Sequence, residues 1–329
     1  MEASIMNCKS RIHRFLGHDA PHVSRRTPAS GFKTLLVPLD GSSRAEHALP
    51  HALAIARRSG ASIRLALVHA PLASTDNSFP IYTKEFSDWD QQQVRQKQLY
   101  LNDVARRIGL RDSVKVTTYL SESQRTVEQL CAAAQGIDLV IMATHGWGRW
   151  GRLWHGSTAG GLLRRLSCPL LLVRGYQSPV DLTGDPIVRQ VLVPLDGSKF
   201  AEQILTPAAA IGQVSDASVT LLHVENSGQT NSNLSTGEVW NYLRHTAKSL
   251  NFRLPTISTR ILQTDARTAQ AVLSFAAQHE FDLVAVTTHA RGGWAQFSRD
   301  SIADAALQRN GMAVLILRPN DILKAGVLV

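Results

Sequence analysis

The chain has 329 residues, 44% of them apolar, which suffices for two domains with buried cores, and its formal net charge is +9. No run approaches the roughly 18 to 20 apolar residues of a membrane-spanning helix, which excludes a protein built on such helices. Three scattered cysteines argue against a disulfide framework and indicate a reducing compartment, so we expect a cytoplasmic protein with no membrane partner.

The positive charge is concentrated in the first half of the chain, where residues 1–180 carry +10 and residues 181–329 carry −1. A basic half favours polyanionic partners in general. Pairs such as Arg57 with Arg58 and Arg106 with Arg107 are, however, typical of solvated helix faces. Because neither half contains clustered base-reading elements, the sequence does not favour nucleic acid as a partner.

Residues 1–31 form a basic segment without sustained hydrophobic periodicity, which predicts a flexible leader. Its arginines and serines faintly resemble a transit peptide, but no amphipathic helix runs through it. Its three histidines have no partner cluster at metal-ligand spacing, and no metal site is predicted there.

After the leader, short β-branched or Leu-rich runs alternate with Ala-rich helical stretches, an order typical of a parallel sheet covered on both faces. Ser43 with Glu46 three residues later fits a capping box for the first helix. We expect strands near 34–39, 62–69, 113–120, 137–143 and 169–174, and helices near 43–59, 86–108, 123–135 and 156–167.

The same alternation returns after residues 176–188, whose glycine and prolines indicate a linker. This gives two domains, 32–175 and 189–320, followed by a short tail at 321–329. The second domain is expected to have strands near 190–195, 217–224, 256–262, 281–287 and 312–318.

The two domains repeat each other in sequence. The hexapeptide Val37–Ser42 recurs unchanged as Val193–Ser198. Four ordered landmarks exceed chance and indicate a duplicated unit. The further landmarks are His69 with His223, His145 with His289, and the apolar run 170–174 with 314–318.

The informative chemistry follows the fourth strand of the first unit. Ala143-Thr144-His145-Gly146 is followed by nine residues and then by Gly156-Ser157-Thr158 at the start of a helix. Glycine lets the backbone approach a ligand, and the helix start supplies unpaired N–H groups and hydroxyls. This combination indicates a phosphate-binding site.

With this motif and the repeated hexapeptide, the chain resembles a tandem universal stress protein over residues 33–174 and 189–318. The resemblance implies an α/β fold with two Rossmann-like domains of the adenine nucleotide alpha hydrolase type, each a five-stranded parallel sheet with helices on both faces. It implies ATP as the ligand, with Mg²⁺ left open. It further implies an intramolecular pseudo-dimer through the strands at 170–174 and 314–318, and leaves open a homodimer and a protein partner.

The nucleotide-binding branch of that family carries Gly, two residues, Gly, nine residues, Gly, then Ser or Thr. Carried over to this chain, the pattern places Ala143 at the first glycine, where a methyl group weakens the match, and Gly146, Gly156 and Ser157 at the other positions. The remaining implied site residues are Asp40 near the ribose and adenine, Pro38 and Leu39 as walls of the base, Ala70 as a backbone contact to adenine, Thr158 beside Ser157, and His145 next to Gly146.

The loop between these glycines contains Arg149 and Arg152, which suit either the terminal phosphates or solvent. Its three tryptophans are more typical of a loop anchored to its own helices than of a base cover. The segment Gly146–Gly151 also fits the dinucleotide fingerprint Gly-x-Gly-x-x-Gly. It follows the fourth strand rather than the first, and no acidic residue follows at the ribose position, so NAD is disfavoured.

The second unit departs from the pattern at every glycine. Thr287 and Ala290 replace the first two, and Asp300 precedes Ser301 where the third belongs. A carboxylate at a phosphate-facing helix start repels a polyanion, although it is a good N-cap for an empty site. The sequence therefore predicts that the first unit binds ATP and that the second does not, or binds something less charged.

The recurring histidines are better explained as structural residues than as a catalytic base, because they also occur in the unit with the degenerate site. No positioned carboxylate accompanies His145 in the sequence, so fast ATP hydrolysis is not supported. Three function classes stay open: a nucleotide-binding regulatory module of a stress response, a scaffold that uses the fold without nucleotide, and a slow ATPase or nucleotidyl-transfer enzyme.

Overall fold

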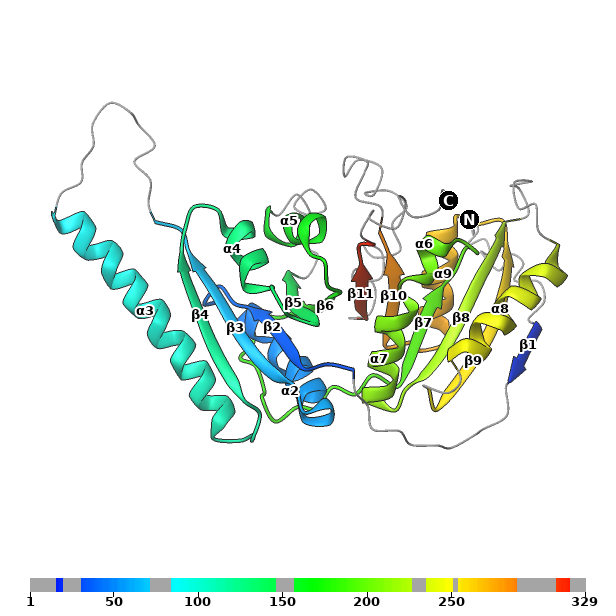
Figure 1. Cartoon of the computed structure of the whole chain (residues 1–329), viewed down its shortest axis with the longest axis horizontal. Helices are drawn as coiled ribbons and strands as arrows, with labels where there is room; N and C mark the ends of the chain where they lie inside the picture. The colour runs from blue at the N-terminus through cyan, green and yellow to red at the C-terminus, as the bar shows by residue number, and fades with distance from the viewer. Residues whose placement is uncertain are drawn as a thin grey trace, which may run out of the picture.

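The computed structural model describes residues 16–19, 31–71, 84–145, 157–226, 235–250, 254–288 and 312–319. Strands and helices alternate along both halves as the sequence predicts (Figure 1). The first unit contains β2 Thr34–Pro38, α1 Ser43–Glu46, α2 Ala48–Ser59, β3 Ser62–His69, α3 Lys84–Gly109, β4 Val116–Glu122, α4 Thr126–Ala133, β5 Leu139–His145, α5 Ser157–Arg165 and β6 Leu170–Gly175.

The second unit repeats this order in the described residues. Its elements are β7 Gln190–Pro194, α6 Lys199–Glu202, α7 Leu205–Ser215, β8 Ser218–Asn226, α8 Thr236–Leu250, β9 Thr256–Thr264, α9 Thr268–Gln278, β10 Leu283–Thr287 and β11 Ala313–Leu317. None of the helices within the described ranges is long and apolar enough to cross a membrane.

The strands form one continuous sheet in the order β1-β9-β8-β7-β10-β11-β6-β5-β2-β3-β4. The five strands of each unit are parallel, and the units meet where β11 pairs antiparallel with β6, with Leu315 opposite Leu171. This confirms the predicted α/β fold and the expected pairing of the last strands. The pairing gives each of these edge strands a hydrogen-bonding partner.

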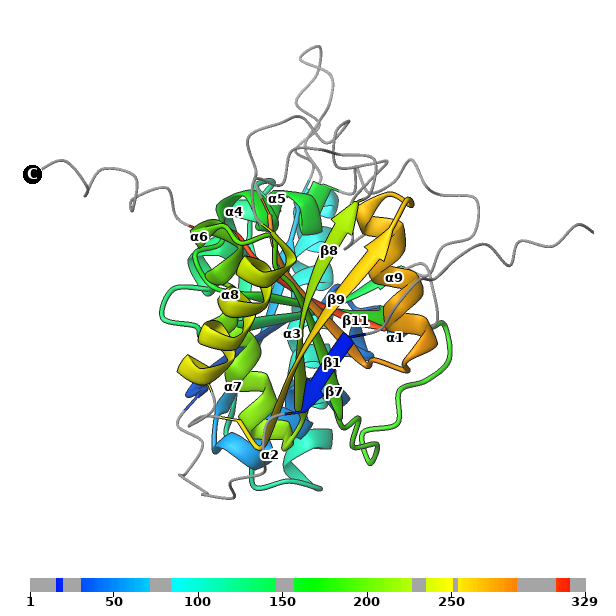
Figure 2. The same cartoon turned by 90° about the vertical axis from the view of Figure 1, so that its right-hand side faces the viewer.

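Helices cover both faces of the sheet. One apolar core joins α2, α3, α7 and α8 to one face, and a second joins α4, α5 and α9 to the other. Figure 2 shows α7 and α8 on one side of the twisted strands and α9 on the other. Each core runs through both units, so the duplicated halves share their apolar packing.

The leader contributes one element that the sequence did not predict. Leu16–Asp19 forms β1 and pairs antiparallel with β9, with Leu16 opposite Ile261. Four residues are too few to show a periodicity, and their partner lies far along the chain, so local pattern reading could not find this strand.

The first predicted helix is interrupted in the structure. α1 ends at Glu46 and α2 begins at Ala48, because Pro50 has no N–H to donate to the Glu46 carbonyl four residues earlier. The proposed capping box is wrong: Ser42, not Ser43, is the N-cap, and its Oγ accepts from the Ala45 N–H at 3.2 Å. In the second unit Pro207, one position later in the alignment, is likewise the third residue of the helix that follows the interruption, α7.

Glu46 has a different role from helix capping. It is buried and accepts a hydrogen bond from Arg107 Nη2 of α3 at 2.9 Å. This pair ties α1 to α3 across the face of the sheet. Because the partners lie 61 positions apart, the spacing of Ser43 and Glu46 gave a misleading local signal.

Arg57 and Arg58 of α2 both form ion pairs, and the pair of Arg58 joins α2 to the linker. Arg58 donates to both carboxylate oxygens of Asp185, at 3.0 and 2.5 Å, and Arg57 donates to both oxygens of Asp112, at 2.7 and 2.8 Å. Leu182 of the linker is buried. The interpretation of Arg57 and Arg58 as solvated charges is therefore wrong, because their acidic partners come from distant parts of the sequence.

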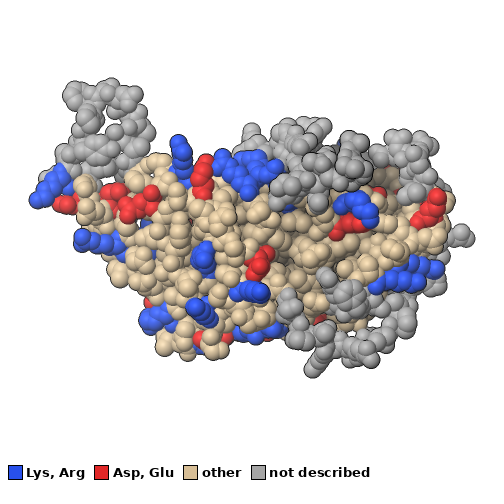
Figure 3. Space-filling view, viewed as in Figure 1, with Lys and Arg blue, Asp and Glu red and all other residues tan. Residues whose placement is uncertain are grey.

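Charges of both signs are interspersed on the face shown in Figure 3. Arg106, for example, is paired with Asp103 at 2.7 Å, although both side chains are largely exposed. The described residues on this face thus show no continuous basic band of the kind that tracks a nucleic acid backbone.

Candidate functional site

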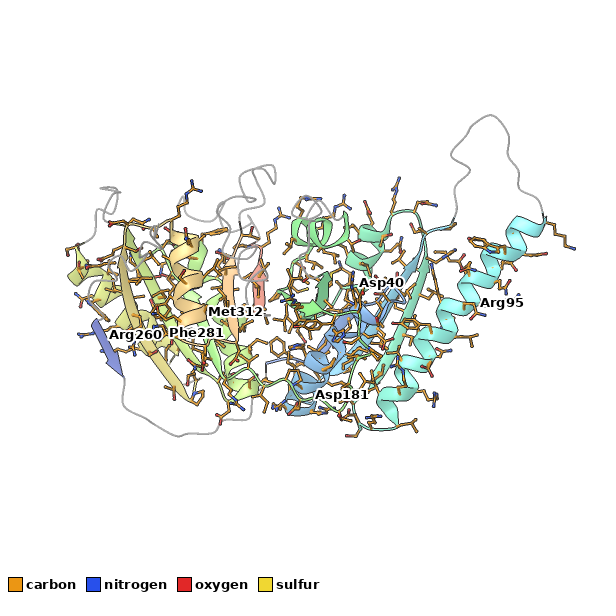
Figure 4. All side chains as sticks on the ribbon, turned by 180° about the vertical axis from the view of Figure 1, so that it is seen from behind. Asp40, Arg95, Asp181, Arg260, Phe281 and Met312 are labelled. Carbon is orange, nitrogen blue, oxygen red and sulfur yellow. The ribbon has the colours of Figure 1, made fainter. Side chains whose placement is uncertain are left out.

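The described site residues of the first unit lie at the carboxyl ends of three neighbouring parallel strands. Asp40 follows β2, Ala70 follows β3, and His145 ends β5, in a sheet ordered β5-β2-β3. The chain leaves β2 toward β3 and later returns to β5 on its other side. Such a switch of direction is where doubly wound sheets bind ligands. Figure 4 labels Asp40 within this unit.

The repeated hexapeptide forms the same turn in both units. Asp40 Oδ1 accepts from the Ser42 N–H at 2.8 Å, and Asp196 Oδ1 accepts from the Ser198 N–H at 2.9 Å. Gly41, between Asp40 and Ser42, has a φ of 90°. This conformation favours glycine, which explains its place in the motif. The turn presents Asp40 as an exposed carboxylate at the end of a buried strand.

The residues flanking Asp40 are buried, as a wall beneath a ligand would be. Pro38 and Leu39 are buried at the end of β2, and Ala143 is 8% exposed in β5. The Ala143 methyl lies in the core beside Gly175, where an added Cβ would stand 3.3 Å from it. Thr158 is half-buried in the first turn of α5.

Part of the predicted site lies outside the described residues. The structure gives the backbone of His145 and Ser157, but Gly146, Arg149 and Gly156 fall in the undescribed segment 146–156. The dinucleotide-like segment 146–151 falls there too. In the second unit the same holds for His289, Ala290, Asp300 and Ser301.

The sheet register corrects the alignment of the two units at β3. Pro38 lies opposite Ala66 and Pro194 opposite Leu222, so His69 corresponds to Glu225 and not to His223. β3 carries its His-Ala pair two residues farther along the strand than β8 carries His223 and Val224. Matching His69 with His223, as the sequence analysis did, pairs Ala70 with Val224, whereas the register pairs Val68 with Val224.

The two histidines consequently make different contacts. Buried His69 contacts Asp90 Oδ1 of α3 through Nε2 at 2.9 Å, and Lys97 Nζ lies 2.7 Å from its Nδ1. His223 Nδ1 lies 2.8 Å from the Leu195 carbonyl oxygen. Both side chains tie elements of the fold together, which agrees with a structural role.

A half-buried tyrosine beside the Asp40 turn was missed by the sequence analysis. Burial raises the pKa of Tyr100 of α3, and the nearby carboxylates of Glu46 and Asp40 raise it further. Tyr242 of α8 repeats this arrangement, with burial and then Glu202 and Asp196 as causes of its raised pKa. The recurrence of a tyrosine in the corresponding helix of both units was the signal that could have found it.

The sequence model of the universal stress protein family matches residues 31–174 and 188–318. The chain therefore belongs to the universal stress protein family, with two copies of its characteristic domain in tandem. A putative universal stress protein of Staphylococcus haemolyticus is 26% identical over 150 residues, which cover 46% of this chain and 89% of that relative.

Solved structures show the same fold over most of the chain. A universal stress protein from Archaeoglobus fulgidus matches with a TM-score of 0.64 and 16% identity, covering 88% of this chain and 97% of its own. A putative universal stress protein from Pseudomonas aeruginosa matches with a TM-score of 0.58 and 15% identity, covering 91% and 98%. At such identities the likeness shows the fold alone.

Proposed function

We propose that the first unit binds ATP at the carboxyl ends of β2, β3 and β5 and that occupancy of this site regulates the protein in a stress response. One observation carries the proposal: exposed Asp40 stands at the switch point of the sheet, and the described start of α5 at Ser157 follows the glycine-bearing segment of the same unit.

The described residues suit an adenine nucleotide. Buried Pro38 and Leu39 offer an apolar wall for a base, and Asp40 uses Oδ1 for its own turn while no bond to Oδ2 is recorded among the described residues. A carboxylate oxygen accepts hydrogen bonds from ribose hydroxyls. Val68, which takes the place corresponding to Val224, joins Ala70 as a candidate for the backbone contact to adenine.

The phosphates would lie against Gly146, Gly156, Ser157 and Thr158. The unpaired N–H groups of a helix start bind phosphate, and α5 has no acidic residue in its first turn. Ala143 departs from the family's first glycine, but its methyl is buried in the core beside Gly175. The Ala143 methyl is therefore no objection to nucleotide binding.

Native mass spectrometry of the freshly purified full chain tests the proposal. We expect a co-purified mass of ATP, removed by dialysis and restored by titration. Gly156→Asp, which copies Asp300 into the first unit, should weaken ATP binding at least tenfold. The matched control is Gly109→Asp, because nothing lies within 4 Å of a Cβ added at Gly109.

If Gly156→Asp binds ATP as tightly as the parent while remaining folded, the proposed phosphate site is wrong. A chain that neither co-purifies with nucleotide nor binds added ATP would favour the scaffold function instead. The melting temperature of each variant, followed by circular dichroism, separates lost binding from lost folding.

A further inference from the structure

A pocket of about 410 Å³ lies where the two units and the linker meet. His51 of α2 lines it from the first unit and Ile187 from the linker, and the second unit supplies Ala277, Glu280, Phe281 and Met312 among others. Its volume is within the range of about 300–1,000 Å³ for small-molecule sites. None of its lining residues belongs to the proposed nucleotide site, and in the second unit it lies at the amino ends of β10 and β11.

The walls of the pocket combine polar and apolar surface in similar shares. Phe281 and Met312 are 8% and 5% exposed, and Figure 4 shows both in the second unit, where β10 and β11 begin. Ile187, which is 44% exposed, adds apolar surface from the linker. A molecule that fills the pocket would therefore bury an apolar body against these side chains.

Glu280 stands at this pocket in a backbone conformation that disfavours it. Its φ is 55°, in the left-handed region, whereas the corresponding residue of the first unit is Gly136 with a φ of 70°. A glycine is the usual residue after a helix in this conformation. The glutamate keeps this strained conformation and brings to the pocket a carboxylate that glycine would not supply.

The charge of Glu280 is uncompensated within the described part of the chain. No hydrogen bond or ion pair of its side chain is recorded there, and the residue is exposed. Asp282, the other acid of the lining, is already used: its Oδ2 accepts from the Arg189 and Gln190 N–H groups at 2.7 and 2.9 Å. The pocket thus offers one available carboxylate beside an apolar wall.

His51 completes the lining without adding positive charge at neutral pH. Burial lowers its pKa to about 4, and the nearby ring of His47 contributes to the decrease. No bond of the His51 side chain is recorded within the described ranges. The neutral ring is therefore a polar group that offers a ligand one donor and one acceptor.

We propose that this pocket binds a small amphipathic amine, whose ammonium group pairs with Glu280 while its apolar body packs on Phe281 and Met312. An acid of the same shape would be repelled by Glu280, because no described lining residue offers it a cation. Since the pocket joins both units and the linker, such a ligand would also stabilise their arrangement.

Three probes of similar shape test this in the full chain: 4-phenylbutylamine, 4-phenylbutanol and 4-phenylbutyrate. Ligand-observed NMR titration at pH 7 measures the binding of each. We expect saturable binding of the amine, with the acid at least tenfold weaker and the alcohol between them. Glu280→Gln should make the amine and the alcohol bind alike. Ala277→Phe, which fills the pocket, should abolish binding of all three.

Glu280→Gly separates a ligand-binding role from a structural one. Glycine relieves the left-handed strain, so the melting temperature should rise while amine affinity falls at least tenfold. Equal binding of amine and acid, amine binding unchanged by both Glu280→Gln and Ala277→Phe, or no saturation by the amine at millimolar concentration would overturn the proposal. ATP titration of Ala277→Phe should match the parent, which keeps this test independent of the nucleotide site.

Discussion

The two units share a turn and a sheet but differ in the contacts around them. Asp40 and Asp196 hold the same turn with nearly the same bond, yet the buried carboxylate of Glu46 pairs with Arg107 while its counterpart Glu202 pairs with Lys199 at the surface. The fold is thus preserved by strand pairing and helix caps, while the side chains around the proposed ligand sites have diverged.

The largest difference in stability is expected at these two ion pairs. Arg107→Met leaves the Glu46 side chain, 11% exposed, without its partner and should lower the free energy of unfolding by about 2–3 kcal/mol. Lys199→Met should change it by less than about 0.5 kcal/mol, because the Lys199 side chain is 92% exposed. Urea denaturation of both variants makes the comparison, and equal costs would contradict it.

Gly161 of α5 tests a close helix contact in the first unit. A Cβ at this position would stand 2.5 Å from Val127 Cγ2 of α4, so Gly161→Leu should cost about 2 kcal/mol. Gly109→Leu is the control, because its Cβ meets nothing within 4 Å. In thermal denaturation, the double variant with Gly161→Leu and Val127→Ala should have a higher melting temperature than Gly161→Leu alone. An unchanged melting temperature would mean that the strain lies at another contact.

His51 gives the first unit a dependence on pH that Pro207, its counterpart, cannot give the second. The folded pKa is lowered from 6.5 to about 4, so the unfolded chain binds more protons between these values. The stabilisation is full above about pH 6.5 and is lost as the pH falls toward 4. In His51→Leu the free energy of unfolding should fall over this pH range by about 1–2 kcal/mol less than in the parent. This is less than the full pKa shift of His51 implies, because the ring is partly exposed.

Urea titrations at pH 7 and pH 4.5 give the change in the free energy of unfolding between the two pH values for each protein. The effect is the difference between this change in the parent and in His51→Leu. A parallel decline in both proteins would show that other groups control the acid transition. The comparison uses each protein as its own reference, so a constant change in stability caused by the leucine does not affect it.

Small effects of opposite sign are expected at the two left-handed positions after α4 and α9. Gly136→Glu should lower the free energy of unfolding by about 1 kcal/mol, and Glu280→Gly should raise it by about the same amount. Differential scanning calorimetry of both variants gives opposite shifts in Tm under this account. Shifts of the same sign would mean that the side chains, and not the backbone conformation, determine the cost.

Much of the fold could be predicted because its signals are local. The run Ser62–His69 was placed correctly as a strand, and the paired halves confirmed one another. Long-range facts were not predictable in this way: the antiparallel partner of β1, the Asp185 partner of Arg58 and the register that makes Val68 the counterpart of Val224 all depend on residues distant in sequence.

The site shows the same division. Asp40, Pro38 and Leu39 could be selected because the resemblance to the family assigns the repeated hexapeptide to the site, and they lie with Ala70 and His145 at one end of the sheet. Tyr100 was missed because a single tyrosine in a long helix has no distinctive spacing, and only its repetition as Tyr242 distinguishes it.

Calorimetric titration of the whole chain with ATP tests the central claim most directly, because it counts sites. The account predicts one ATP per chain, with the heat of binding lost in Gly156→Asp and unchanged in a variant of the second unit, Ser301→Asp. Two sites per chain, or one site that survives Gly156→Asp and disappears in Ser301→Asp, would contradict the assignment of the nucleotide to the first unit.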